Sequence, residues 1–214
     1  MTESQDLPIL LDDYLKSPPD YVPKAWRTLM AALKQALADQ RGEEVVSVFR
    51  RAIVPGLDFI TLQSLCKFHN RLRQEHIIPP ARKKLAVLGS FTTSQLVPFI
   101  ELFSFAGGAD IEVYEAEYGV FRQEVIDPDS PLYRTAPKIV WLATTWRDIS
   151  RWPGVADSRE QVDALVYAEL GDWLSLWTTL HERLGCQVIQ NGFELPVYPT
   201  LGNHEMRHPS GRGR

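Results

Sequence analysis

The sequence has few cysteines, no long apolar run and no excess of positive charge. Its 214 residues include two cysteines, Cys66 and Cys186, which are far apart and lie in apolar patterns. A disulfide framework needs more cysteines than this, so we expect both thiols to be reduced and packed. No stretch approaches the length of a membrane span, and residues 1–17 lack the basic and apolar regions of a signal peptide. We therefore expect a cytoplasmic protein that does not associate with membranes.

Several common functional signatures are also missing. The formal net charge is −4, so no global positive field predicts nucleic-acid binding. There is no P-loop, no HExxH, no paired CxxC and no GxGxxG after the first predicted strand. The five histidines have no convincing metal-ligand spacing, so we expect neither a metal nor a cofactor. Asp127 and Asp129 in VIDPDS superficially match the acid pair of aspartyl-phosphate phosphatases, but their surroundings favour a turn.

Residues 1–80 are predicted to form a small helical module. An apolar stripe that includes Trp26 and Leu33 indicates a helix within the stretch 23–42, with Gly42 at the C′ position just beyond its end. A shorter helix is expected over 45–53. Asp58 is a good N-cap for a third helix that reaches Leu72, and Pro79-Pro80 closes the region.

From residue 81 to 205 the pattern alternates between strands and helices. Short apolar runs predict strands at 85–88, 111–114, 139–143 and 187–190, with a helix beginning near Thr93 after the first of them. A capping box of Ser158 and Gln161 begins a long helix, 159–184, whose apolar face includes Val166, Leu170 and Leu174. This alternation predicts an α/β fold with a doubly wound parallel sheet. Residues 206–214 are expected to be a flexible tail.

Polar residues follow each of the four predicted strands. In a parallel sheet the carboxyl ends of the strands meet at one edge, where α/β proteins bind their ligands. Taken singly, such residues are ordinary turn and cap formers. Taken together, they predict a binding crevice formed by Ser90, Thr92, Thr93, Tyr118, Gly119, Thr144, Thr145, Gln190 and Asn191.

Ser90 lies directly after the first strand and before a helix. It is either a nucleophile or a small residue at a strand-to-helix turn, and its position alone does not decide between the two. A serine hydroxyl without a base stays protonated and is weakly nucleophilic. His208, three residues after Glu205, has the spacing of an acid–histidine pair that could serve as that base.

Three blocks of the sequence together resemble the amino-terminal half of FkbH-like proteins. They are LAVLGSFTTSQLVPFIELF, IEVYEAEYGVFRQEVIDPDSPLYRTAPKIVWLA and VIQNGFELPVYPTLGNHE, and they cover most of 83–205. The resemblance implies an SGNH (GDSL-like), flavodoxin-like fold for this half. In that family a haloacid-dehalogenase-like half follows and transfers a glyceryl unit from a phosphoglycerate donor to an acyl carrier protein thiol. Such proteins belong to polyketide and related natural-product pathways.

The sequence departs from that family in two ways. It stops shortly after LGNHE, without the buried acid pair of the phosphatase-like half, so we expect an SGNH-like domain that is incomplete at its C-terminal end. Glyceryl loading would then need a longer protein or a separate phosphatase-like partner. Aligning the GDSL block with GSFT also places Phe91, not Ser90, at the nucleophile position. Gly119 matches the glycine that donates to an oxyanion in SGNH enzymes.

Three functions follow as hypotheses. The first is an accessory domain that binds an acyl carrier protein or its acyl group through the strand-end residues. The second is a serine esterase or thioesterase with Ser90 as nucleophile, Gly119 with Thr144 or Asn191 as oxyanion donors, and His208 as base. The third is an inactive remnant. Because carrier proteins are acidic, docking would use a local basic cluster, and the best candidate is Arg50, Arg51, Lys67, Arg71 and Arg73. These residues can equally be a solvated helix face.

Overall fold

The computed structural model describes residues 6–18, 21–81, 83–194, 201–204, 206–208 and 210–211. The chain forms two compact units, one of residues 1–82 with 95–112 and the other of residues 83–94 with 113–214. The first unit therefore includes a segment beyond the predicted helical module, and the domain boundaries inferred from the sequence stay a prediction. Among the described residues, no helix has both the length and the apolar character needed to cross a membrane.

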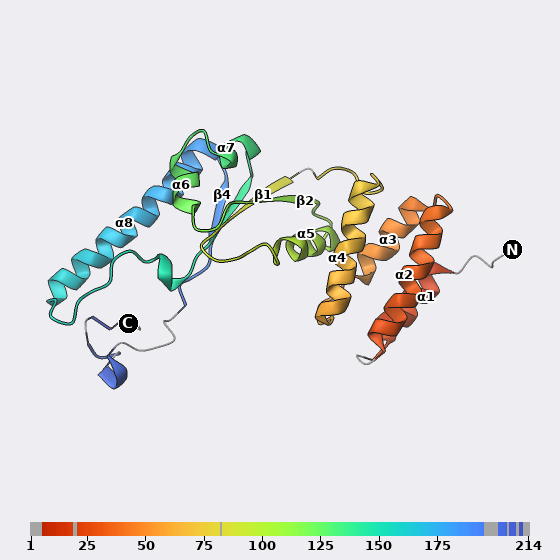
Figure 1. Cartoon of the computed structure of the whole chain (residues 1–214), viewed down its shortest axis with the longest axis horizontal. Helices are drawn as coiled ribbons and strands as arrows, with labels where there is room; N and C mark the ends of the chain where they lie inside the picture. Colours follow the sequence, from red (N-terminus) through yellow and green to blue (C-terminus); the bar gives the residue numbers. More distant parts are fainter. Residues whose placement is uncertain are drawn as a thin grey trace. The chain divides into compact units, whose positions relative to one another are not determined.

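The first unit is built from helices around one apolar core (Figure 1). They are α1 (Leu7–Lys16), α2 (Val22–Ala38), α3 (Gly42–Ala52), α4 (Phe59–Gln74) and α5 (Val97–Ala106). Asp58 caps α4 as predicted, because its carboxylate accepts the N–H groups of Ile60 and Thr61. The role predicted for Gly42 was wrong: it begins α3, and Gln40 takes the left-handed conformation after α2, with φ of 61°.

The second unit contains a four-stranded parallel sheet flanked by helices, which confirms the predicted α/β class (Figure 1). Its strands are β1 (Lys83–Gly89), β2 (Ile111–Glu115), β3 (Ile139–Ala143) and β4 (Gln187–Gln190). Their order in the sheet is β2-β1-β3-β4, the order of the first four strands in flavodoxin-like folds. From β1 the chain adds β2 on one side of the sheet and then β3 and β4 on the other. The switch point of the sheet therefore lies between β1 and β3.

Helices and turns connect these strands. After β2 come α6 (Phe121–Ile126) and α7 (Pro131–Thr135), and after β3 come the 3-10 helix η1 (Trp146–Asp148) and the long α8 (Arg159–Leu184). A second 3-10 helix, η2 (Gly202–His204), follows β4. Asp127 and Asp129 form an exposed turn in which the Asp129 N–H donates to the Asp127 carboxylate at 2.9 Å, as the composition predicted.

Helix α8 begins and ends at the predicted residues. Ser158 and Gln161 form the capping box, and Gly185 ends the helix with a left-handed φ of 57°. Its predicted apolar face is only partly buried. Trp173, Leu176 and Leu180 pack against the sheet core, together with Phe121 and Leu142. The prediction was wrong for three residues of this face, which remain exposed: Val166, Leu170 and Leu174.

Candidate functional site

The carboxyl ends of β1, β3 and β4 bring polar side chains together at the switch point. Ligands of open α/β sheets bind in the crevice at this place. Ser90 follows β1, Thr144 and Thr145 follow β3, and Asn191 follows β4. The backbone N–H of Ser90 donates to the carbonyl of Ala143 at 3.2 Å, which continues the pairing of β1 with β3 by one bond.

Ser90 is hydrogen-bonded to a carboxylate. Its hydroxyl donates to Oδ2 of Asp148 at 2.5 Å, and the same oxygen accepts the backbone N–H of Thr145 at 2.7 Å. Thr145 and Asp148 form a capping box around η1, which fixes the carboxylate beside the strand end. Arg122 holds the other side of this turn by donating to the carbonyl of Asp148 at 3.0 Å.

Asn191 joins β4 to β3 by a two-way amide contact. Its Oδ1 accepts the N–H of Thr144 at 3.0 Å, and its Nδ2 donates to the carbonyl of the same residue. Gln190 adds a bond from Nε2 to the Thr144 hydroxyl at 3.3 Å and accepts from Nε1 of Trp177 at 2.7 Å. Thr144 is fully buried, so its side chain stabilises the floor of the site and does not present a free group to a ligand.

The loop after β1 is held by Thr93 and Glu115. The Thr93 hydroxyl donates to Oε1 of Glu115, the last residue of β2, at 2.6 Å. Gly89 is tightly enclosed, because a Cβ there would lie 3.0 Å from both the carbonyl of Phe91 and Cγ2 of Thr93. Gly119 has φ of 75° and donates its N–H to the carbonyl of Gly89 at 3.3 Å, so this donor already has a partner.

The other predicted site residues lie apart from this hydrogen-bonded cluster. Thr92 and Tyr118 are exposed, and Tyr118 has 72% of its surface accessible. His208 follows η2, and its Nδ1 accepts the N–H of Ser210 at 3.2 Å. Ser210 in turn donates its hydroxyl to the carbonyl of Gly154 at 2.6 Å. Glu205, the acid suggested for His208, is outside the described residues.

Sequence reasoning missed Asp148, Glu115 and Arg122. Asp148 could have been found, because Thr145-Trp-Arg-Asp148 has the spacing of a capping box. In such a box the carboxylate accepts the backbone N–H of Thr145, which places it near the end of β3. Glu115 could have been suspected as the last residue of a strand. The approach of Arg122 from α6 had no local signal, since 26 residues separate it from Asp148.

The cluster consists of hydroxyl, amide and carboxylate groups that are hydrogen-bonded to one another. Two carboxylates, on Asp148 and Glu115, each accept a hydrogen bond from a hydroxyl group, so they orient Ser90 and Thr93. Over the part of the chain that is described, no three or more His, Cys, Asp or Glu side chains gather in a way that could hold a metal ion. A polar ligand would bind here by exchanging hydrogen bonds with these groups, among which Ser90 is half-buried.

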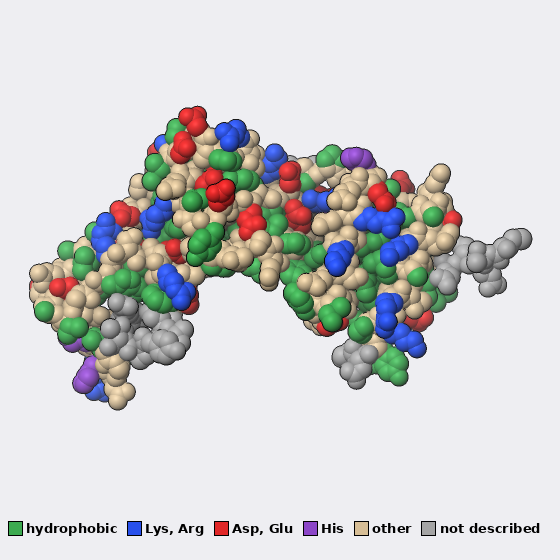
Figure 2. Space-filling view, in the orientation of Figure 1, with side chains coloured by type: hydrophobic (Ala, Val, Ile, Leu, Met, Phe, Trp, Pro, Cys, Tyr) green, Lys and Arg blue, Asp and Glu red, His purple; other side chains and the backbone are tan. Residues whose placement is uncertain are grey.

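The basic cluster predicted for docking is partly used within the first unit. Arg73 pairs with Glu101 at 3.7 Å and Asp110 at 3.6 Å, and Arg71 pairs with Glu75 at 2.7 Å. The Arg50 guanidinium stacks over the ring of Phe105, 4.5 Å from its centroid. The two remaining members, Arg51 and Lys67, are exposed. Figure 2 shows several Lys and Arg side chains on the visible face of this unit.

The fold is shared with a solved structure. It is a crystal structure of the N-terminal part of the protein BF1531 from Bacteroides fragilis, which contains a phosphatase domain and is complexed with Mg. The match has a TM-score of 0.52 and 20% sequence identity. It covers 69% of this chain and 38% of that chain, so this chain spans well under half of its structural neighbour. No family model matches the sequence, and no curated protein matches it.

Proposed function

We propose that this chain is an SGNH-like accessory domain of an FkbH-type system. In this role it binds and positions an acyl carrier protein, or the acyl group on it, for glyceryl transfer in polyketide or related biosynthesis. The phosphatase-like chemistry would be supplied by another domain or polypeptide. Two observations support the proposal. The sequence has three FkbH-like blocks, and its fold is similar to that of a solved protein part that contains a phosphatase domain.

The observation that carries the proposal is the group of strand-end side chains around Ser90. Its hydroxyl and the Asp148 carboxylate lie at the switch point, where α/β folds bind small ligands. A glyceryl group has hydroxyls and a carbonyl, which need donors and acceptors of this kind. Thr92 and Tyr118, both exposed and close in sequence to Ser90 and Gly119, would contact the carrier or its prosthetic arm.

Ester hydrolysis is less well supported than binding. A serine hydrolase needs a base that takes the hydroxyl proton, commonly a histidine. Among the described residues, the Ser90 hydroxyl donates to Asp148, and the ring nitrogen Nδ1 of His208 is turned to the N–H of Ser210. Ser90 as a nucleophile stays a hypothesis, and the following experiment tests it together with binding.

The test is a titration of the chain against the acyl carrier protein encoded nearest to its gene. Apo, holo and glyceryl-loaded carriers are compared, with Ser90→Ala and the exposed Ser94→Ala as a matched control. The proposal predicts that the loaded carrier binds about tenfold more tightly than the apo carrier, a difference of roughly 1.4 kcal/mol. Ser90→Ala should weaken the loaded complex without affecting the apo complex, and Ser94→Ala should change neither.

Two results would contradict this proposal. Release of the glyceryl group by the wild-type chain but not by Ser90→Ala would identify a thioesterase. Equal affinity for all three carriers would remove acyl-group recognition from the strand-end cluster, and no binding to any carrier would leave the remnant hypothesis in its place.

A further inference from the structure

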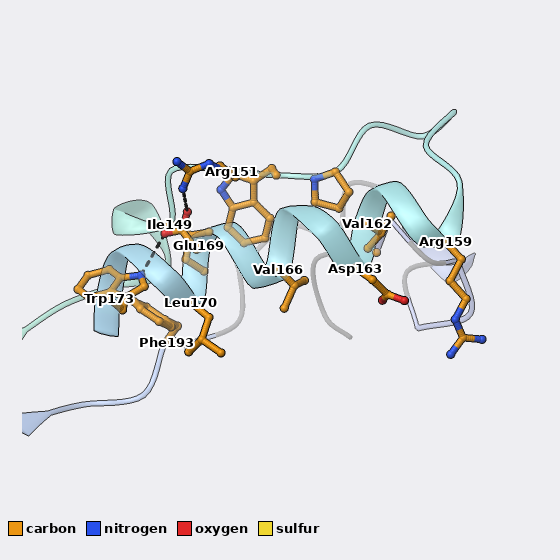
Figure 3. A pocket seen from close by; sticks show the side chains of 13 residues that line it. Ile149, Arg151, Arg159, Val162, Asp163, Val166, Glu169, Leu170, Trp173 and Phe193 are labelled. Carbon is orange, nitrogen blue, oxygen red and sulfur yellow. Dashed lines mark hydrogen bonds and ion pairs between the residues drawn. The ribbon is translucent and has the colours of Figure 1, made fainter. Parts of the chain in front are cut away.

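A groove of about 450 Å³ runs along the first half of α8, in the second unit (Figure 3). One side is the helix, and the other is the segment from Ile149 to Pro153. Pockets that hold small molecules have volumes of roughly 300–1,000 Å³ and mostly apolar walls. The walls here are mostly aliphatic and aromatic side chains, among them Trp152, Val166, Leu170 and Phe193.

The polar groups around Glu169, near the aromatic end of the groove, are already bonded to one another. Oε1 of Glu169 accepts the N–H of Ser150 at 3.1 Å and Nε1 of Trp173 at 3.0 Å. Its Oε2 accepts from Arg151 at 3.3 Å, and Arg151 also donates to Asp172 at 2.7 Å. A polar ligand would have to break these bonds to find partners of its own. The floor of the groove therefore favours an apolar occupant.

The shape of the groove favours a chain over a compact ring system. Its lining extends along α8 from Arg159 to Trp173, which corresponds to roughly 21 Å of helix axis. A volume of 450 Å³ drawn out over that length makes a long, narrow groove. Trp152 and Pro153 also line it.

The two ends of the groove differ in polarity. Trp173 and Phe193 lie at one end, with ring centroids 5.3 Å apart, and Arg159 and Asp163 lie at the other (Figure 3). Arg159 and Asp163 are exposed, whereas Trp173 is buried. An occupant would keep a polar head in water at the charged end and place its apolar tail against the aromatic rings.

We propose that this groove binds an unbranched, medium-length fatty acyl chain, with the carboxyl end near Arg159. This site goes beyond the function proposed above and does not depend on it, because a glyceryl unit is short and polar. The two sites are neighbours in the same unit. Arg122, which donates to the carbonyl of Asp148, also stacks over Trp173 at 4.6 Å.

The test uses the full chain and ω-bromododecanoate, because bromine quenches the fluorescence of indoles that it contacts. Two indoles, Trp152 and Trp173, line the groove. Below the micelle concentration we expect saturable quenching with one ligand per chain. Unlabelled dodecanoate should reverse it, and butyrate and pantetheine should not.

A matched pair of variants locates the binding. Leu170 lines the groove and is 44% exposed, whereas Leu174 is 47% exposed, lies one turn later and does not line it. Leu170→Glu should weaken binding at least tenfold, and Leu174→Glu should leave it unchanged. Both positions are exposed enough for a charged side chain without loss of folding, which circular dichroism verifies.

Three outcomes would overturn the inference. Absence of quenching would show that no chain enters. Equal losses in both variants would indicate adsorption to the exposed apolar side of α8. Equal competition by pantetheine would show that an amide-containing arm occupies the groove instead of an aliphatic chain.

Discussion

The hydroxyl of Ser90 donates a 2.5 Å hydrogen bond to the carboxylate of Asp148, 58 residues further along the chain. This bond joins the end of β1 to the turn after β3, across the switch point of the sheet. It explains how a serine that follows a strand is oriented without a histidine beside it. It also makes the strand-end cluster depend on a residue pair that can be tested directly.

A double-mutant cycle measures this pair. We expect Ser90→Ala to lower the free energy of unfolding by about 1–2 kcal/mol, because it removes a hydrogen bond to a carboxylate. Asp148→Ala should cost more, since it also leaves the N–H of Thr145 without its partner. Urea unfolding should give a coupling energy of about 1 kcal/mol between the two sites. Ser94→Ala, at an exposed position, should stay within about 0.5 kcal/mol of wild type. Additive effects of the two substitutions would contradict the contact.

The amide of Asn191 provides a second prediction. Asn191→Asp keeps the acceptor for the Thr144 N–H but turns a charged oxygen toward the carbonyl of Thr144, where Nδ2 donates in the wild type. We expect a loss of about 1–3 kcal/mol in the free energy of unfolding at neutral pH. The loss should shrink in acid, because protonation of the new carboxyl restores a donor. Thermal unfolding over a pH series checks this, and a loss that does not depend on pH would exclude the two-way contact.

Two glycines should respond to alanine in opposite directions. Gly89→Ala places a methyl group 3.0 Å from the Phe91 carbonyl and from Thr93, so it should displace Thr93 from Glu115 and cost about 1–3 kcal/mol. Gly171→Ala, in the middle of α8 with nothing within 4 Å, should stabilise the protein by about 0.5–1 kcal/mol. Melting temperatures of the two variants provide the comparison. A neutral Gly89→Ala would mean that the loop after β1 is loosely packed.

His69 should make the first unit sensitive to acid. Burial, and to a lesser extent the charge of Arg73, lowers the pKa of His69 to about 4, and its side chain is 1% exposed. In the unfolded chain the histidine pKa is about 6.5. Between about pH 4 and about pH 6.5 the unfolded chain therefore binds a proton at this histidine that the folded chain does not bind. Stability should therefore fall as the pH drops from about 7 to 4, by up to roughly 3 kcal/mol from this group.

Replacing the imidazole isolates this contribution. Nε2 of His69 is buried without a hydrogen-bond partner among the described residues, so His69→Leu should be tolerated and should flatten the pH dependence between about 4 and 6.5. His181→Leu, at an exposed position on α8, is the matched control and should keep the slope. Urea midpoints measured across this pH range decide the outcome. An unchanged slope in His69→Leu would assign the acid sensitivity to other groups.

Elements with a strong local signal were predicted well. β3 and β4 have the predicted bounds, since apolar runs beside turn residues define them on both sides. The start of α8 was clear from Ser158 and Gln161, because a capping box is a contact between neighbours in sequence. The strand-end residues Ser90 and Asn191 were placed at one edge by the parallel arrangement alone.

What depends on long-range packing could not be predicted. The apolar spacing before and along α5 predicted a stripe of Leu96, Phe99, Ile100 and Phe103, but Leu96 and Phe103 are exposed. Leu102 and Phe105 join the core of the helical unit instead. Leu170 and Leu174 continue the apolar pattern of α8, yet they remain exposed. Their exposure could not be predicted, because an apolar pattern does not show which part of a helix is covered by other elements. The hydrogen bond from Ser90 to Asp148 joins two turns that are 58 residues apart. No local sequence pattern indicates which distant turns come into contact.

The most direct test of the proposed function is hydrogen exchange of the backbone amides, with and without the glyceryl-loaded carrier protein. We expect slower exchange at the strand-end loops, around Ser90, Gly119 and Thr145, and a smaller effect with the apo carrier. Peptides from the first half of α8, which line the groove, should exchange at the same rate in both states. Unchanged exchange at the three strand-end loops, with protection elsewhere or nowhere, would contradict carrier recognition at this site.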